Sequence, residues 1–260
     1  MAWRSDLGTK LPGGPLAYGL ACQGSDVSLS VLGGSDGEKP RPETLVIDSV
    51  KTSHGMGIRD LGVAVVLSAG GEVLNRRLIV GGTKDAADLS GLVRSAHEIV
   101  FIDKPGQDRH YKALPLADYP GKPFAVAASA VLGDELFLFG GMNYDAAAKA
   151  PVNSTEAYAF SPAKNTWRKL RPLAVAARGL CAVALDDHRI YIAGGYTTDF
   201  TADAVIYDTK TDTYTPAKPL PYAAMVSLVR LGDYIYCLGG EDKKQSRTDK
   251  CFRIPVADLK

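Results

Sequence analysis

The stretches LFLFGG at 136–141, IYIAGG at 190–195 and IYCLGG at 235–240 decide the fold of this 260-residue chain. Each is a short apolar run that ends in two glycines, and SLSVLGG at 28–34 and RRLIVGG at 76–82 repeat the pattern. The first glycines of successive pairs lie 45 to 59 residues apart. A period of this length indicates an architecture of repeated units, each of which buries its apolar face against its neighbours.

Every repeat has the same internal order. A strand of small residues, such as AVAASAVL or GLCAVALD, precedes a tight turn and the strand that ends in the glycine pair. A third strand follows, and an outer strand carries an aromatic residue at Tyr111, Trp167 or Tyr214. Strand-length runs without helical periodicity predict an all-β chain. Because kelch blades recur every ~50 residues, we expect a kelch-type β-propeller, in which Trp3, Tyr111 and Trp167 are blade-packing aromatics.

The repeats predict five four-stranded blades in one domain that spans residues 1–260. After Gly240 the chain has room for a third strand but not for an outer one. We expect residues 2–8, with Trp3, to supply that outer strand and so remove an exposed edge. In the first blade the outer strand should be short or absent. An incomplete six-bladed propeller is the alternative.

Composition excludes several classes of partner. Thirty Lys and Arg balance 29 Asp and Glu, so no chain-wide field is present to hold nucleic acid or an anionic membrane. No apolar run approaches the ~20 residues that span a bilayer. The opening MAWRSDLGTK lacks the apolar core of a secretory signal, and composition leaves the compartment undetermined.

Cysteine and histidine patterns predict no metal site and no cofactor. The four cysteines have no CxxC spacing, and His54, His97, His110 and His188 show no pairing typical of metal ligands. Buried free thiols are the expected state of the cysteines. A cross-strand bridge between Cys237 and Cys251 stays open, because they fall on successive strands of one blade.

The last repeat resembles one family closely. Gly240-Glu241, followed by five residues and then Arg247-Thr248-Asp249, is similar to a motif of bacterial N-acetylneuraminate epimerases, which are sialate mutarotases. Ala17-Tyr18-Gly19 resembles the start of that family's final blade. A final blade placed first corresponds to the circularly permuted branch of the family, whose members have six blades. The blade that this chain lacks would neighbour the motif.

The resemblance implies an isomerase that interconverts anomers of N-acetylneuraminate, a sugar acid, and it implies export to the periplasm. Glu241 and Arg247 match the family's proposed catalytic pair. A carboxylate can act as the base and then the acid in ring opening, and an arginine can hold the substrate carboxylate in a bidentate contact.

Further substrate contacts are expected from residues that begin an inner strand or follow a glycine pair. Those residues are Arg178, Asn143 and Tyr196. A propeller fold does not itself set function. The second hypothesis is therefore a non-catalytic kelch module that binds a protein or a glycan. A mutarotase needs Glu241 and Arg247 to converge at an open channel mouth, whereas a binding module would present an apolar patch on a loop face.

Overall fold

The computed structural model describes residues 20–23, 28–32, 44–48, 62–64, 66–102, 105, 110–244, 246 and 248–260. Within these ranges the chain is built from β-strands with two short 3-10 turns, Leu89–Gly91 and Val256–Leu259. None of the described helical turns has the length and apolar character needed to cross a membrane.

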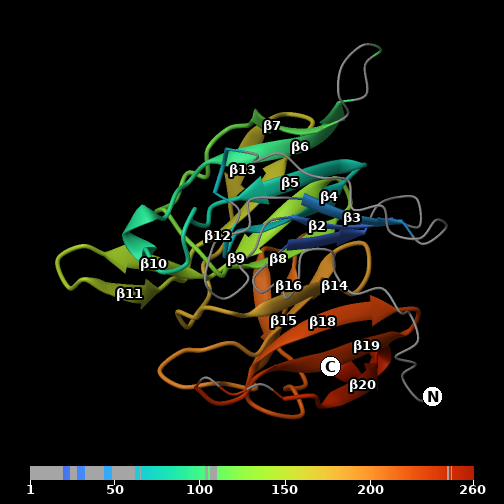
Figure 1. Cartoon of the computed structure of the whole chain (residues 1–260). Helices are drawn as coiled ribbons and strands as arrows, with labels where there is room; N and C mark the ends of the chain where they lie inside the picture. The colour runs from blue at the N-terminus through green and yellow to red at the C-terminus, as the bar shows by residue number, and fades with distance from the viewer. Residues whose placement is uncertain are drawn as a thin grey trace.

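The strands form successive antiparallel sheets, here called blades 1 to 5 in chain order (Figure 1). Blade 1 has β1 (Leu20–Gln23), β2 (Ser28–Leu32) and β3 (Thr44–Asp48); blade 2 has β4 (Ala69–Val73), β5 (Arg76–Val80), β6 (Ala96–Ile102) and β7 (His110–Pro115); blade 3 has β8 (Ala128–Leu132), β9 (Glu135–Phe139), β12 (Ala157–Ser161) and β13 (Thr166–Lys169). Blade 4 has β14 (Cys181–Ala184), β15 (Arg189–Ala193), β16 (Ala204–Asp208) and β17 (Thr213–Pro216); blade 5 has β18 (Met225–Leu231), β19 (Tyr234–Glu241) and β20 (Cys251–Pro255).

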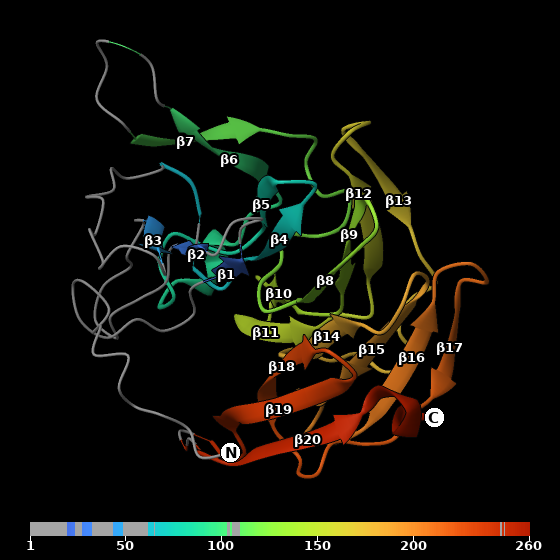
Figure 2. The ribbon, with the colours of Figure 1, turned by 90° about the vertical axis from the view of Figure 1, so that its right-hand side faces the viewer.

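The first strands of successive blades lie side by side, β1 with β4, β4 with β8, β8 with β14 and β14 with β18 (Figure 2). This is the arrangement of a propeller, and it confirms the predicted fold class. Three blades have the four predicted strands, whereas blades 1 and 5 have three described strands each. The expected outer strands of those two blades, including the closing strand at residues 2–8, lie outside the described residues.

Small residues on the inner strands allow neighbouring blades to approach closely. A Cβ added at Gly71 of β4 would lie 2.7 Å from Val131 Cγ2 of β8, a separation too short for two carbon atoms. The Ser129 hydroxyl of β8 also donates a hydrogen bond to the Gly70 carbonyl, at 2.8 Å. The small residues on the inner strands therefore have a direct steric cause.

The glycine pair joins one blade to the next. At the end of β9, Gly140 and Gly141 have φ angles of +65° and +96°, which favour glycine. A Cβ at Gly140 would lie 2.6 Å from the Ala177 carbonyl oxygen of the next blade, which accepts a 2.8 Å hydrogen bond from Gly141 N. A Cβ at Gly141 would lie 2.8 Å from the Ala125 oxygen of its own blade. The same arrangement recurs at Gly81–Gly82 with Phe124 and at Gly194–Gly195 with Ala224.

The described outer-strand aromatics pack within their blades, as predicted for Tyr111 and Trp167, whereas Trp3 lies outside the described residues. Trp167 of β13 lies opposite Phe160 of β12, with ring centroids 4.7 Å apart. Tyr214 of β17 lies opposite Tyr207 of β16, at 4.9 Å. Tyr111 of β7 is buried against Phe101 of β6. Each pair adds aromatic contact area between the third and fourth strands of its blade.

The register of β19 and β20 decides whether Cys237 and Cys251 can form a disulfide bond. Cys237 lies opposite Phe252, and Cys251 lies opposite Leu238. The two cysteines are therefore offset by one residue, so their side chains point to opposite faces of the sheet. Cys237 is buried and Cys251 is exposed, and both are free thiols. The bridge that the sequence left open is not formed.

A hairpin follows the third glycine pair, between the second and third strands of blade 3. It consists of β10 (Met142–Asp145) and β11 (Ala150–Asn153). The hairpin projects from one side of the molecule in Figure 1 and lies near the centre of the ring of blades in Figure 2. It therefore stands at the end of the ring that carries the glycine pairs.

Candidate functional site

On blades 2 to 5, the residue after the glycine pair is the cross-strand partner of the residue that enters the inner strand of the same blade. These partners form one end of the ring, called the Gly-pair mouth here: Val66 with Thr83, Ala125 with Met142, Arg178 with Tyr196, and Met225 with Glu241. On blades 2 and 3, Thr83 and Met142 are buried. On blades 4 and 5, Arg178, Tyr196 and Glu241 are half-buried. Among the mouth residues that the structure describes, the partly exposed polar side chains therefore lie on the neighbouring blades 4 and 5.

Arg178 is held from two sides. Its guanidinium carbon lies 4.5 Å from the centroid of the Tyr196 ring, within the range of a cation–π contact. Its Nη1 donates a 2.9 Å hydrogen bond to Asn153 Oδ1. An arginine fixed in this way presents its remaining N–H donors in a defined direction, as recognition of a carboxylate requires.

Asn153 connects the β10–β11 hairpin to blade 4. While its Oδ1 accepts from Arg178, its Nδ2 donates to the carbonyl oxygens of Tyr196 at 3.1 Å and Thr197 at 2.7 Å. Both the oxygen and the nitrogen of the Asn153 amide are therefore hydrogen-bonded. Sequence reasoning missed this residue. The unusual length of the segment between Gly141 and the third strand was the available signal, because a longer segment can turn back over the mouth.

Glu241 ends β19 and lies opposite Met225 at the start of β18. The backbone of Met225 packs against Gly240, and its side chain packs against Gly179. Gly240 directly precedes Glu241 and Gly179 directly follows Arg178. Met225 therefore lies between the backbone at Glu241 on blade 5 and the backbone at Arg178 on the neighbouring blade 4. Arg247, the predicted partner of Glu241, lies outside the described residues.

The rim of blade 5 beside Glu241 is polar. Lys250 Nζ lies 3.4 Å from Asp242 Oδ2 and 5.0 Å from the centroid of the Tyr222 ring. Tyr222 donates its hydroxyl to the Gly239 carbonyl at 2.7 Å. Burial, the contact with Cys237 and the charge of Asp242 raise the pKa of Tyr222 above its ordinary value. Tyr222 is therefore a neutral hydrogen-bond donor that anchors the glycine pair of blade 5 at neutral pH.

Asn143, the third predicted substrate contact, lies apart from Arg178 in the hydrogen-bond network. It stands on β10 opposite Val152, and its Nδ2 donates to the Pro123 carbonyl at 2.9 Å. The structure thus brings Arg178 and Tyr196 together at one position of the mouth, and it uses Asn143 to attach the hairpin to the segment that enters blade 3.

Asp186, Asp187 and His188 form a cluster of potential metal ligands in the turn between β14 and β15, with ligand atoms within 4.8 Å of one another. Their charges already have protein partners. Arg189 Nη2 lies 2.5 Å from Asp186, and Lys210 Nζ lies 3.2 Å from Asp187. The cluster is accounted for as a hydrogen-bonded turn.

Comparison with known proteins supports the fold and indicates a relationship. A family model described as the Kelch motif matches residues 126–174 and 177–221. The N-acetylneuraminate epimerase of Salmonella paratyphi B is 26% identical over 190 residues, which cover 58% of this chain and 49% of that protein. Mouse Kelch-like protein 36 is 29% identical over 125 residues, which cover 46% of this chain and 20% of that protein.

Among solved structures, that of YjhT matches with a TM-score of 0.62 and 19% identity, covering 77% of this chain and 66% of that one. The chain spans about half the length of the epimerases that it matches. The repeated glycine pairs and the succession of antiparallel sheets agree with the matched Kelch motifs. The chain is therefore a kelch-repeat β-propeller.

Proposed function

We propose that this propeller is a sugar-acid mutarotase that interconverts the anomers of N-acetylneuraminate at the Gly-pair mouth. The observation that carries the proposal is the placement of Arg178, Tyr196 and Glu241 on neighbouring blades, with Met225 between the two backbones. The similarity to N-acetylneuraminate epimerases supports the choice of substrate.

In this proposal Glu241 transfers the proton. Its carboxylate takes the proton from the anomeric hydroxyl, the bond between the anomeric carbon and the ring oxygen breaks, and the ring oxygen receives the proton. The open-chain ketone then rotates and closes on its other face by the reverse steps. The reaction needs no cofactor, because no electrons are transferred and every proton returns.

Arginine has a matching role, because the substrate carries a carboxylate at the anomeric carbon. Arg247 is assigned to that carboxylate by its place in the motif, six residues after Glu241. Arg178, oriented by Asn153 and Tyr196, is assigned a second contact with the sugar acid. Tyr196 offers the apolar face of its ring and a hydroxyl to the sugar.

The decisive experiment follows the equilibration of pure α-anomer of N-acetylneuraminate by NMR, with and without the protein. We expect acceleration by the wild type and a loss of roughly 100-fold or more in Glu241→Gln, in line with the usual contribution of a general acid–base group. Glu135→Gln is the matched control, because Glu135 begins β9 and pairs with Arg168 in the turn region away from the glycine pair. Acceleration that is absent, or unchanged in Glu241→Gln, overturns the proposal.

A protein-binding module is the second candidate, and two exposed valines favour it. Val152 of the β10–β11 hairpin is 47% exposed, and Val175, which precedes Arg178 in the loop that enters blade 4, is 62% exposed. In this candidate function the two valines belong to one apolar patch beside the mouth, because contiguous exposed apolar patches are typical of interaction surfaces. Binding of a partner that weakens in the double variant Val152→Ser, Val175→Ser, with mutarotation absent, would favour this function.

A further inference from the structure

Backbone hydrogen bonds define equivalent positions in the segments that connect one blade to the next. At one position the N–H group donates to the carbonyl two residues before the third strand of the blade that the segment leaves; this position is held by Tyr119, Leu173 and Leu220. At another the carbonyl accepts from the second glycine of that blade's pair; this position is held by Phe124, Ala177 and Ala224. The three junctions between blades 2 and 5 can therefore be compared residue by residue.

Aromatic rings fill the junction between blades 2 and 3. The centroid of the Tyr119 ring lies 4.6 Å from that of Phe124 in the same segment. On blade 3 it lies 4.9 Å from the centroid of Tyr158 and 5.4 Å from that of Trp167. The Tyr119 hydroxyl donates to Glu156 Oε2 at 3.4 Å. This junction therefore encloses a phenol ring of the chain itself, with the hydroxyl directed at a carboxylate.

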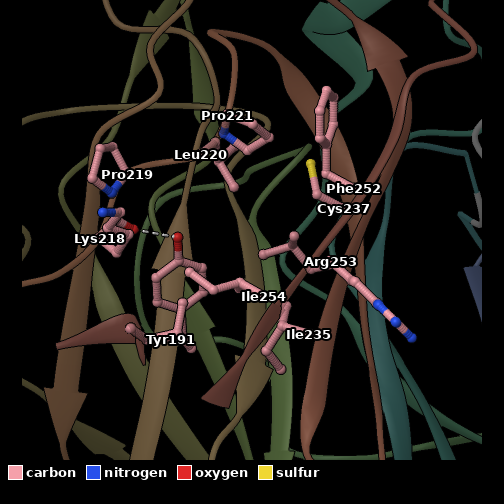
Figure 3. A pocket seen from close by; sticks show the side chains of 12 residues that line it. Tyr191, Lys218, Pro219, Leu220, Pro221, Ile235, Cys237, Phe252, Arg253 and Ile254 are labelled. Carbon is pink, nitrogen blue, oxygen red and sulfur yellow. Dashed lines mark hydrogen bonds between the residues drawn. The ribbon is translucent and has the colours of Figure 1, made fainter. Parts of the chain in front are cut away.

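The junction between blades 4 and 5 also holds an aromatic ring of its connecting segment. The ring centroids of Tyr222 and Phe252 lie 5.8 Å apart. Phe252 is the second residue of β20, as Tyr158 is of β12. Figure 3 shows Phe252 and Leu220 in the wall of this junction. At both junctions, an aromatic ring of the connecting segment thus packs against an aromatic ring on the third strand of the next blade.

The junction between blades 3 and 4 has smaller side chains at the same positions. Leu173 and Ala177 stand where the junction between blades 2 and 3 has Tyr119 and Phe124. Val205 is the second residue of β16, where β12 has a tyrosine and β20 has a phenylalanine. A pocket of about 210 Å³ lies between these residues. It is larger than the ~150 Å³ apolar cavity that admits a benzene molecule.

This pocket has apolar walls and a carboxylate. Ile192 and the Tyr214 ring line it together with the three residues of the preceding paragraph, and Asp203 lies at its polar end. Asp203 directly precedes β16, as Glu156 directly precedes β12. It therefore holds the position of the carboxylate that accepts from Tyr119. No hydrogen bond or ion pair between residues that the structure describes uses the Asp203 carboxylate.

We propose that this pocket is a binding site for a phenol ring, which packs between Leu173 and Val205 and donates its hydroxyl to the Asp203 carboxylate. The preceding junction shows the same arrangement built from Tyr119 and Glu156. A ligand ring would thus restore at one junction the packing that the chain supplies at the other. The residues that line the pocket do not include those assigned to the sugar acid, so the inference is independent of the proposed function.

Titration with p-cresol tests the proposal, and toluene is the matched ligand without a hydroxyl. We expect saturable shifts in the backbone amide NMR signals of residues 173–177 and 203–205, with p-cresol bound roughly fivefold or more tighter than toluene. Asp203→Ala should reduce the affinity for p-cresol to that for toluene. Asp134→Ala, which removes an exposed carboxylate from the turn between β8 and β9, should change neither. No saturable shift at these residues, or equal affinity for the two ligands in the wild type, overturns the proposal.

The source of the ring is found with a second probe, because free phenols and the tyrosine side chain of a partner protein carry the same group. Val175, which lines the pocket, is exposed, so the pocket has access to the surface. N-acetyl-tyrosine methylamide that binds at least as tightly as p-cresol would identify a partner's tyrosine as the occupant. Binding of p-cresol alone would identify a free phenol. Binding of neither probe overturns the proposal.

Variants that fill the pocket give an independent test. Leu173→Tyr introduces the residue that the preceding junction has as Tyr119, and it should lower the affinity for p-cresol at least tenfold in the folded protein. Val205→Phe fills the pocket from the sheet and gives the same test if Leu173→Tyr does not fold. Leu231→Tyr, at an exposed position of β18, is the control and should leave the affinity unchanged. Wild-type affinity for p-cresol in either folded pocket variant overturns the proposal.

Discussion

Arg178 and Tyr196 are cross-strand partners at the Gly-pair mouth, and the guanidinium lies 4.5 Å from the ring centroid. The contact exists because Tyr196 is the first residue after a glycine pair and Arg178 is the residue that enters the inner strand. Every described blade from 2 to 5 has this pair of positions. The propeller thus offers a ring of paired positions. On blades 4 and 5 these positions carry polar and charged side chains that can bind a ligand or transfer a proton.

Replacement of Arg178 should weaken substrate binding without slowing the chemical step. Arg178→Lys keeps the charge but loses the stacked, forked guanidinium that contacts Asn153 and Tyr196. If Arg178 contacts the substrate carboxylate, KM for N-acetylneuraminate should rise roughly tenfold, with kcat little changed. Steady-state mutarotation measured by NMR gives both constants. An unchanged KM would remove Arg178 from the substrate contacts.

Asn153 should act through Arg178 as a positioning residue. Asn153→Ala removes the acceptor for Arg178 Nη1 and the two hydrogen bonds to blade 4. A hydrogen bond to a charged group contributes about 1.5–3 kcal/mol, so we expect kcat/KM to fall roughly tenfold or more. Lys149→Asn is the control on the same hairpin, because residue 149 has φ +50° and is exposed at the turn. Asn153→Ala added to Arg178→Ala should cause no further loss, and an additive loss would contradict the positioning role.

Much of this arrangement could be predicted from sequence because its causes are local and repeated. The glycine pairs mark the places where carbonyl groups of two blades approach the same backbone, so their spacing predicts the blades. The rule that mouth residues follow a glycine pair or enter an inner strand correctly placed Arg178 and Tyr196.

Other features depend on contacts that no local pattern encodes. The role of Asn153 arises because a hairpin of blade 3 turns toward blade 4. The failure of Cys237 and Cys251 to form a bridge depends on a register offset of one residue. Asn143 satisfied the sequence rule for a mouth residue, but its amide hydrogen-bonds the Pro123 carbonyl.

The glycine pair should be intolerant of a side chain. Gly141→Ala would place a Cβ 2.8 Å from the Ala125 carbonyl at a φ of +96°. We expect a loss of about 2–4 kcal/mol in the free energy of unfolding, from strain and from displaced backbone. Gly133→Ala is the matched control, because its φ is +60° and nothing lies within 4 Å of the added Cβ, so the positive φ alone should cost about 1–2 kcal/mol. Equal losses in urea unfolding would show that the contact with Ala125 has no energetic role.

The turn between β14 and β15 should make stability depend on acid pH. Burial opposes ionisation of Asp186, but hydrogen bonds from the Arg189 side chain and from the backbone of His188 and Arg189 outweigh it and lower the pKa of Asp186 to about 2. A carboxyl group with a depressed pKa stabilises the fold above its unfolded pKa near 4, and that contribution is lost as the pH falls toward 2. We therefore expect Asp186→Asn to reduce the free energy of unfolding by about 1 kcal/mol at pH 6, after solvent screening of this partly exposed group.

The same variant should differ much less from wild type near pH 2. About half of the Asp186 carboxyl groups are then protonated in the folded state and nearly all in the unfolded state, so most of the stabilisation from the depressed pKa is lost. Urea unfolding of both proteins between pH 2 and pH 6 measures the difference. Asp187→Asn is the control, because Asp187 is more exposed and is paired with Lys210 at 3.2 Å, so its loss should matter less. A stability difference between wild type and Asp186→Asn that stays constant from pH 6 to pH 2 would contradict the ionised state of Asp186 as the source of the stabilisation. The turn would then owe its stability to contacts of the Asp186 side chain that are independent of its charge and that asparagine does not reproduce.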